Sequence, residues 1–184
     1  MTSVNQKLIV LLKSSRSQVC LSACQTAGHL FEHVADTGRP EFDDIVDILL
    51  CKTADSNKSI RIEANAALDC MVTHIAPTHS VRALCMRGPS HKNPLVRIAV
   101  ARLLLSVVEL IGVDKIMSEK MLDGTRKRII NTMAMVILDN NMILRKMGHQ
   151  LYSQLSKDQN YKRYSNKYLD KETRISITSI IKKL

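Results

Sequence analysis

The sequence predicts an all-α fold in which helical hairpins stack side by side into an α-solenoid. Three observations predict this class: a five-residue motif recurs along the chain, apolar residues follow each copy at helical spacing, and helix-breaking residues fall between these segments. The composition agrees, because the 184 residues include nine Met, no Trp, six Gly and four Pro. Such a balance favours helices over sheets rich in aromatic residues and turns.

The repeated motif is Asn, two variable residues, an apolar residue and Arg. It occurs as Asn57–Arg61, Asn93–Arg97 and Asn141–Arg145, with weaker copies around Val19 and at Asp170–Arg174. The full copies begin 36 residues apart (57 to 93) and 48 residues apart (93 to 141). These intervals bracket the roughly 40 to 47 residues of helical-pair repeats of the HEAT and armadillo type, so the motif indicates a repeat architecture.

Each copy is expected to open a helix with one apolar face. The apolar residues that recur at helical spacing are Val19, Ala23, Ala27, Leu30 and Val34; Ile60, Ala64, Ala67, Leu68, Met71 and Ile75; Val96, Val100, Leu103, Leu104, Val107 and Leu110; and Leu144, Met147, Leu151 and Leu155. A shorter amphipathic segment precedes each motif, at Leu8–Leu12, Phe42–Leu50, Val81–Met86 and Ile129–Leu138. The repeating unit is therefore helix, turn, helix.

The breakers between these units are Gly38–Pro40, Pro77, Gly112 and the polar stretch Ser156–Asn160. We predict a single domain over residues 1–184, with approximate repeats at 4–36, 41–76, 78–111, 124–156 and 160–184. An extra short helix within Val113–Asp123 would account for the longer interval between the second and third motifs.

The motif has a structural explanation that requires no ligand. Asn, or Pro94 at the first helical position, starts the helix, and the apolar residue fills the core. Arg in the first turn opposes the helix dipole, which suggests a partner that compensates it. An acid lies six residues before two of these arginines, Asp55 before Arg61 and Asp139 before Arg145. Two interpretations stay open for this pair of arginines, an internal Asp–Arg salt-bridge ladder between neighbouring repeats and contact with a partner.

The third motif arginine differs, because the residue six positions before Arg97 is His91 and not an acid. We therefore expect Lys92 and Arg97 to lack a local acidic partner. The turn from Lys92 to Arg97 is the best single candidate for function.

The formal charge is +10, from 27 Lys and Arg against 17 Asp and Glu. This excess favours acidic partners, which include nucleic acid, anionic membranes and acidic proteins. Five cysteines without a Cys-x-x-Cys pair lie in apolar helical patterns and are expected to be reduced, buried thiols of a cytoplasmic protein. We expect neither a signal peptide nor a membrane-spanning segment.

The turn sequences resemble those of TOG domains, the tubulin-binding HEAT-repeat modules of the microtubule polymerase, CLASP and crescerin families, the last also called TOG array regulators of axonemal microtubules. The clearest match is His91–Arg97, which is similar to the Lys-Asn-Pro-x-Val-Arg turn of these domains; Asp55–Arg61 and Asp139–Arg145 are also similar. The resemblance runs from about Leu8 to Leu184. It implies a HEAT-repeat fold that binds αβ-tubulin or microtubules.

In TOG domains the turns within repeats contact the tubulin heterodimer, and stacking should place them on a common edge. Carried over motif by motif, the resemblance implies ten tubulin-contacting residues: Arg16, Ser17, Asn57, Lys58, Lys92, Asn93, Arg97, Asn140, Asn141 and Arg145. It further implies a role in microtubule assembly, a cytoplasmic and cytoskeletal location, and a link to the cilium or axoneme.

One departure from the family concerns the first turn, where TOG domains commonly present a Trp to tubulin. This chain has no Trp. Two explanations stay open: the family's first repeat lies upstream of Met1, which the alignment of turns favours, or the domain has diverged and lacks that aromatic anchor.

One short segment matches a catalytic motif. The segment His29–His33 matches the His-x-x-Glu-His pattern of inverted zinc metallopeptidases, but a third ligand and a substrate cleft would be required. We expect ordinary helix residues there, with no metal site, no catalytic residue and no cofactor. A HEAT-repeat adaptor for another acidic protein is the main competitor.

Nucleic-acid binding is less favoured. It would use Arg126–Arg128, Lys157–Lys167 and Lys182–Lys183 for phosphates, and four tyrosines to stack bases, Tyr152, Tyr161, Tyr164 and Tyr168.

Overall fold

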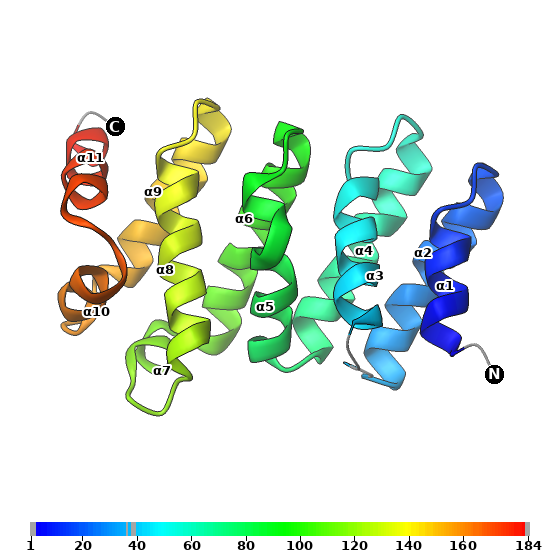
Figure 1. The fold of residues 1–184 in the computed structure, drawn as a ribbon, viewed down its shortest axis with the longest axis horizontal. Helices are drawn as coiled ribbons and strands as arrows, with labels where there is room; N and C mark the ends of the chain where they lie inside the picture. Colours follow the sequence, from blue (N-terminus) through cyan, green and yellow to red (C-terminus); the bar gives the residue numbers. More distant parts are fainter. Residues whose placement is uncertain (1–2, 36, 38–39, 183–184) are drawn as a thin grey trace.

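The protein folds as a row of antiparallel helical pairs (Figure 1). The computed structural model describes residues 3–35, 37 and 40–182, and within these residues it contains eleven α-helices, one short 3-10 helix and no strand. The predicted all-α class is confirmed. Asp36 at the end of the first predicted repeat, Gly38 and Arg39 of the first predicted breaker, and Lys183 and Leu184 lie outside the described residues.

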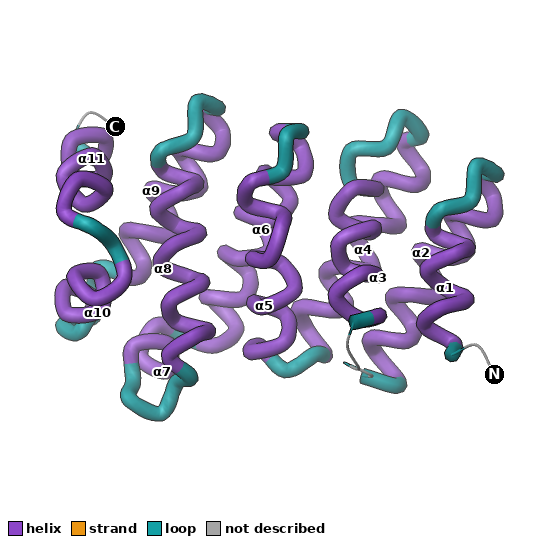
Figure 2. The backbone as a smooth tube through the Cα atoms, viewed as in Figure 1, coloured by secondary structure: helices purple, strands orange, loops and turns teal. Residues whose placement is uncertain are grey.

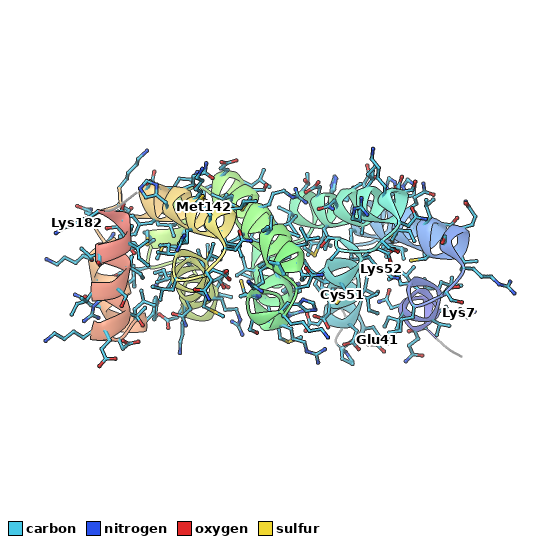
Figure 3. All side chains as sticks on the ribbon, turned by 90° about the horizontal axis from the view of Figure 1, so that it is seen from above. Lys7, Glu41, Cys51, Lys52, Met142 and Lys182 are labelled. Carbon is cyan, nitrogen blue, oxygen red and sulfur yellow. The ribbon has the colours of Figure 1, made fainter. Side chains whose placement is uncertain are left out.

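Four helical pairs form two layers, which Figure 3 shows along the length of the row. The pairs are α1 (Val4–Leu12) with α2 (Ser17–His33), α3 (Glu41–Lys52) with α4 (Lys58–His74), α5 (Pro77–Arg87) with α6 (Pro94–Ile111), and α8 (Asp123–Ile137) with α9 (Met142–Leu155). The first helices contact one another in the order α1, α3, α5, α8, and the second helices in the order α2, α4, α6, α9. Each helix therefore packs against its own partner and against the equivalent helix of the next pair.

Most of the core positions predicted for the second helices of the pairs are buried. The residues of the second predicted stripe, from Ile60 to Ile75, are all buried. Two predicted core positions are wrong: Val34 is 59% exposed and Leu110 is 60% exposed. Val34 follows the last residue of α2, and Leu110 lies in the last turn of α6, so both exposed positions are at helix ends.

One continuous core runs through the row from Leu8 to Ile177. A smaller cluster of Ala101, Val136 and Leu144 lies between α6, α8 and α9. Among the described residues, no helix combines the length and the hydropathy that would be needed to cross a bilayer.

The cysteines depart in part from the expectation of buried thiols. All five are free, and Cys20 and Cys24 are buried, but Cys51 at the end of α3 is exposed. Its sulfur lies 3.8 Å from His91 Nε2 of the next pair. Burial raises the pKa of Cys24 to about 12, so this thiol stays protonated at neutral pH.

The insert after α6 contains a short helix, α7 (Val113–Met117), and a 3-10 helix (Gly88–Ser90) follows α5. The last two helices, α10 (Tyr161–Tyr168) and α11 (Lys171–Ile181), both contact α8. In Figure 1 they lie one above the other at the end of the row and do not form another antiparallel pair. The regular two-layer pattern thus ends at α9.

A buried arginine on α8 joins this end of the row to the α7 loop. Arg126 donates hydrogen bonds to the backbone oxygens of Ile116 (2.9 Å), Met121 (3.0 Å) and Ser118. Its guanidinium carbon lies 3.8 Å from the ring centroid of Tyr164, a cation–π arrangement. Arg126 is only 3% exposed. Its hydrogen bonds to these carbonyl oxygens offset the free energy that is lost when the charged group leaves water.

The α8–α9 pair depends on a glycine at its closest approach. A Cβ atom at Gly148 of α9 would lie 2.6 Å from Ile137 Cγ1, 2.7 Å from its backbone nitrogen and 2.9 Å from its Cα. Backbone atoms cannot move aside as the end of a flexible side chain can. The two helices must therefore separate if any side chain is placed there.

We predict that Gly148→Ala lowers the free energy of unfolding by about 1 to 3 kcal/mol through overpacking. Gly28→Ala is the matched control within a helix, because its Cβ would meet only ordinary contacts, the nearest at 3.5 Å from Ala67 Cα. The control should be neutral or stabilising by up to about 1 kcal/mol from helix propensity. Urea unfolding of the two variants gives the comparison, and equal effects would contradict the close approach of α8 and α9.

Candidate functional site

The four connections within pairs lie on one edge of the row, at the top of Figure 2, whereas the connections between pairs lie on the opposite edge. We call the first of these the turn edge. It consists of residues 13–16, 53–57, 91–93 and 138–141 with the first turns of the helices that follow them. The expectation that the three full motifs share an edge is therefore met, because successive pairs stack in the same orientation.

The motif asparagines start the helices through their side chains. Asn57, Asn93 and Asn141 are the N-cap residues of α4, α6 and α9, and each Oδ1 accepts a hydrogen bond of 2.9 Å from the backbone nitrogen two residues on. This bond satisfies a backbone donor that the helix itself leaves unpaired. The same asparagine oxygens are thus already used by the fold.

The residue two positions before each asparagine completes the turn. Asp55 and Asp139 accept hydrogen bonds from the backbone nitrogens of Asn57 (2.9 Å) and Asn141 (2.8 Å). His91 Nδ1 does the same for Asn93 at 3.1 Å. The acid of the motif therefore has a local structural role, and a neutral imidazole nitrogen can replace it.

Two of the motif arginines fold back over their own turns. Arg61 Nη1 donates to the backbone oxygens of Asp55 and Ser56, both at 2.8 Å. Arg97 Nη1 donates to the backbone oxygens of His91 (2.8 Å) and Lys92 (3.2 Å). These carbonyls compensate the arginine charge near the helix N-terminus, so an external partner is not needed for that purpose.

Asp55 and Arg61 do not form the side-chain ion pair that an Asp–Arg ladder would use. Asp55 is hydrogen-bonded by Lys52 Nζ at 3.2 Å, and Arg61 reaches only its backbone oxygen. The hydrogen bond from Asn57 lowers the pKa of the Asp55 carboxyl, burial opposes this shift, and Lys52 adds to it. Lys52 is labelled beside Cys51 in Figure 3.

Arg97 was expected to lack a local acidic partner, and its acidic partner comes instead from the next turn. Its Nε donates to Asp139 Oδ2 at 2.7 Å and its Nη2 to Asp139 Oδ1 at 3.1 Å, a two-pronged ion pair between neighbouring turns. The side chains are 20% and 13% exposed. Burial raises the pKa of Asp139, but the hydrogen bonds from Arg97 and Asn141 outweigh it and hold the pKa below its usual value. Arg97 therefore fixes one turn against the next.

Because Arg97 bonds to both carboxylate oxygens of Asp139, the arginine of the last motif does not pair with that acid. Arg145 is half-buried and has no hydrogen bond or ion pair to any part of the chain that the structure describes. It still lies close enough to Asp139 to contribute to the lowered pKa of that carboxyl. Of the three motif arginines, Arg145 is the one whose guanidinium is available to a partner.

The other predicted contact residues divide by exposure. Arg16, Ser17, Lys58, Lys92 and Asn140 are exposed on the turn edge. The side chains of Arg16, Lys58 and Lys92 make no ion pair with described residues. With Arg145, each of the four turns therefore presents at least one cation without an ion pair to described residues.

Sequence reasoning missed an apolar component of this edge. Leu95 is 51% exposed, Met142 60% and Ile143 54%, and all three lie in the first turns of α6 and α9. Met142 is labelled in Figure 3, which looks down on the turn edge. The signal was present, because only the fourth motif position faces the core and an apolar residue at the second or third position must therefore face outward.

Several residues of the alternative nucleic-acid surface are used by the fold. Tyr161 and Tyr164 are buried, and Arg126 is bound to carbonyls. Lys167 pairs with Asp123 at 2.6 Å, and Arg163 with Glu119 at 3.4 Å. Buried rings cannot stack on bases, so this alternative loses two of its four tyrosines, while Tyr152 and Tyr168 are half-buried.

Comparison with known proteins bears out the resemblance that the turn sequences indicated. No family model matches the chain. It is 29% identical over 176 residues to TOG array regulator of axonemal microtubules protein 1 of Mus musculus. The matched region covers 94% of this chain and 10% of that relative. It is 24% identical over 156 residues to crescerin-like protein che-12 of Caenorhabditis elegans, with coverages of 84% and 12%. The chain thus spans only 10% and 12% of the lengths of these relatives.

Solved structures show the same fold. One comes from work on tubulin recruitment and assembly by microtubule polymerases with TOG domain arrays; its TM-score is 0.67 at 17% identity, over 99% of this chain and 38% of that chain. Another comes from work on TOG–tubulin binding specificity in microtubule dynamics and mitotic spindle formation; its TM-score is 0.62 at 16% identity, over 97% of this chain and 65% of that chain. The predicted HEAT-type solenoid is therefore confirmed as a fold.

The Arg97–Asp139 pair makes a prediction about stability and its dependence on pH. Asp139→Asn should lower the free energy of unfolding at pH 7 by about 1.5 to 3 kcal/mol, the range for hydrogen bonds to charged groups. Because folding lowers the pKa of Asp139, its contribution is full above the unfolded value of about 3.9 and is lost as pH falls through the folded value. The deficit of the variant should therefore shrink between pH 5 and pH 2.

Urea unfolding at several pH values measures this deficit. Asp114→Asn, which changes an exposed carboxylate of α7, is the matched control and should stay within about 0.5 kcal/mol of the parent. A pH-independent deficit in Asp139→Asn would show that the loss arises from packing and not from the ion pair.

Proposed function

We propose that this chain is a tubulin-binding module that acts in microtubule assembly and engages the αβ-tubulin heterodimer through its turn edge. The observation that carries the proposal is the gathering of four turns on one edge, each with an uncommitted cation. The relatives named as regulators of axonemal microtubules and the TOG structures studied with tubulin support the choice of partner. The names of these relatives also support a cytoskeletal location and a role in the axoneme of cilia.

The cations of the turn edge suit a partner with an acidic surface. Arg16, Lys58, Lys92 and Arg145 come from four successive turns, so they form a line along the edge and not a compact cluster. A net charge of +10 raises the rate of encounter with such a partner, and this contribution weakens as salt screens it. These charges raise the association rate and orient the partner more than they raise the binding affinity.

The apolar residues of the turn edge supply surface that a partner can bury away from water. Leu95, Met142 and Ile143 lie at two neighbouring turns, beside Lys92 and Arg145. Apolar side chains surrounded by charged ones form the usual anatomy of an interface, in which the centre excludes water and the rim stays wet. In a chain without Trp, this patch takes the place of an aromatic anchor in the third and fourth turns.

Arg97 has a different role from the one that the resemblance implied. Its guanidinium is held by Asp139 and by two turn carbonyls, so binding a partner directly would require those bonds to break. We assign it to positioning of the third and fourth turns relative to each other. The asparagines Asn57, Asn93 and Asn141 similarly shape the edge through their cap oxygens, and we assign their amide nitrogens as the donors that they offer to a partner.

The charge contribution can be tested by reversal. We expect Lys58→Glu/Lys92→Glu/Arg145→Glu to weaken tubulin binding at least about tenfold at low salt, because three favourable charges become unfavourable. The control Lys115→Glu/Lys120→Glu/Lys127→Glu carries the same change of net charge in exposed residues near the opposite edge. Binding is measured by gel filtration or sedimentation of the purified chain with tubulin, and helix content by circular dichroism.

Equal loss in both triple variants would mean that net charge alone drives association and that the turn edge is not the site. Retention of another acidic protein by the parent, with no retention of tubulin, would favour the adaptor function instead.

The apolar contribution is separable by its salt dependence. Leu95→Ser/Ile143→Ser should weaken tubulin binding by about tenfold at both low and high salt, because burial of apolar area is not screened. Leu110→Ser/Leu122→Ser is the matched control, since both leucines are exposed, at 60% and 63%, away from the turn edge. Binding unaffected in the first variant would remove the apolar patch from the interface.

A further inference from the structure

Three potential metal ligands lie together at the C-terminal end of α2. Glu32 and His33 lie three and four residues after His29, so each is a neighbour of His29 on the helix surface. All three are exposed. α2 begins at the turn edge and ends at the opposite edge (Figure 1), so this cluster is remote from the surface proposed to bind tubulin.

The geometry of the cluster is close to that of a ligand set. The two imidazole rings are stacked, with centroids 6.2 Å apart and an angle of 10° between their planes. Glu32 Oε2 lies 3.6 Å from His33 Nε2. One ligand atom from each of the three residues can be chosen so that all lie within 4.8 Å of one another.

A small adjustment of side chains would complete the site. Zinc binds histidine nitrogen at about 2.0 to 2.1 Å and carboxylate oxygen at about 2.0 to 2.2 Å, so two ligand atoms on one ion lie roughly 3.3 Å apart. The movement from 4.8 Å to that separation needs rotation of exposed side chains alone. No core contact would have to break.

The electrostatic surroundings favour a cation. The helix ends at this point, where the backbone nitrogens of Val34 and Ala35 both bond to Leu30 O and Ala35 adopts φ 50°. Cations are stabilised near the C-terminus of a helix by its dipole. Glu63 of α4 lines the same shallow groove as His29 and Glu32, and it adds a second negative charge near the cluster.

In place of the ordinary helix residues expected from the sequence, we propose that His29, Glu32 and His33 bind one divalent transition-metal ion of the zinc class. Two imidazoles and a carboxylate suit Zn²⁺, Ni²⁺ or Cu²⁺ better than Mg²⁺ or Ca²⁺, which prefer several oxygen ligands. Glu32 acts here as a ligand, in contrast to the general-base role that a metallopeptidase motif would give it. The ion would cross-link the last turn of α2, and its remaining coordination positions would be filled by water or by a group from another molecule.

Isothermal titration of the untagged chain with Zn²⁺ tests the proposal. We expect one equivalent to bind, and His29→Ala/His33→Ala to weaken that binding at least tenfold. Glu32→Gln should also weaken it, and Zn²⁺ should raise the melting temperature of the parent but not that of the double variant. The control His74→Ala/His149→Ala removes two histidines from other helices and should bind Zn²⁺ as the parent does.

Failure of the parent to bind, or equal binding by the parent and His29→Ala/His33→Ala, would overturn the proposal. Unchanged affinity in Glu32→Gln would contradict the three-ligand site. Selective binding of Mg²⁺ or Ca²⁺ over Zn²⁺ would contradict the assigned class of metal. None of these outcomes depends on tubulin, so this site and the turn edge are tested independently.

Discussion

No helical pair in this protein can bury its apolar surface alone. A helix such as α4 carries buried residues that face α3 in its own pair and others that face α2 and α6 in the neighbouring pairs. The hydrophobic effect therefore requires the pairs to stack in one orientation, because only then does each helix meet its equivalent in the next pair. The two layers, the continuous core from Leu8 to Ile177 and the common edge of the turns all follow from this requirement.

The common edge is where stacking and binding compete for the same residues. The asparagines Asn57, Asn93 and Asn141 start helices, and Asp55 and Asp139 close the turns. Each of these side chains already accepts a hydrogen bond from a backbone nitrogen of the protein. The side chains that remain for a partner are Lys58 and the apolar residues at the second and third motif positions, Lys92 just before its motif, and Arg145 at the end of the last one. Lys58, Lys92 and the apolar side chains at the second and third positions can change without loss of the turn, so specificity can vary on a constant scaffold.

The end of the row shows what happens when stacking stops. α10 and α11 both lie against α8, and Arg126 fills the space between α8, the α7 loop and Tyr164 with a cation whose donors are satisfied by carbonyls. Polar contacts and ring stacking replace the regular pair there. The cluster at the end of α2 lies outside both the stacking contacts and the turn edge, which leaves its ligands uncommitted apart from the contact between Glu32 and His33.

The sequence by itself determined the features that depend on residues close together in the chain. The helix starts at Asn57, Asn93 and Asn141, the buried stripe from Ile60 to Ile75 and the shared edge of the turns could all be predicted, because caps, helical spacing and a repeat period are local properties.

Only the tertiary structure decided which charges pair and which apolar residues stay outside. Asp139 bonds to Arg97 of the preceding turn and not to Arg145 of its own, because stacking brings side chains from neighbouring repeats closer than the local backbone brings the nearer arginine. The exposure of Leu110 and Val34 likewise depends on where helices end. The placement of α10 and α11 on α8 depends on where the regular row of pairs ends. Local spacing fixes the face on which a residue lies, but the packing of other repeats decides what, if anything, that face meets.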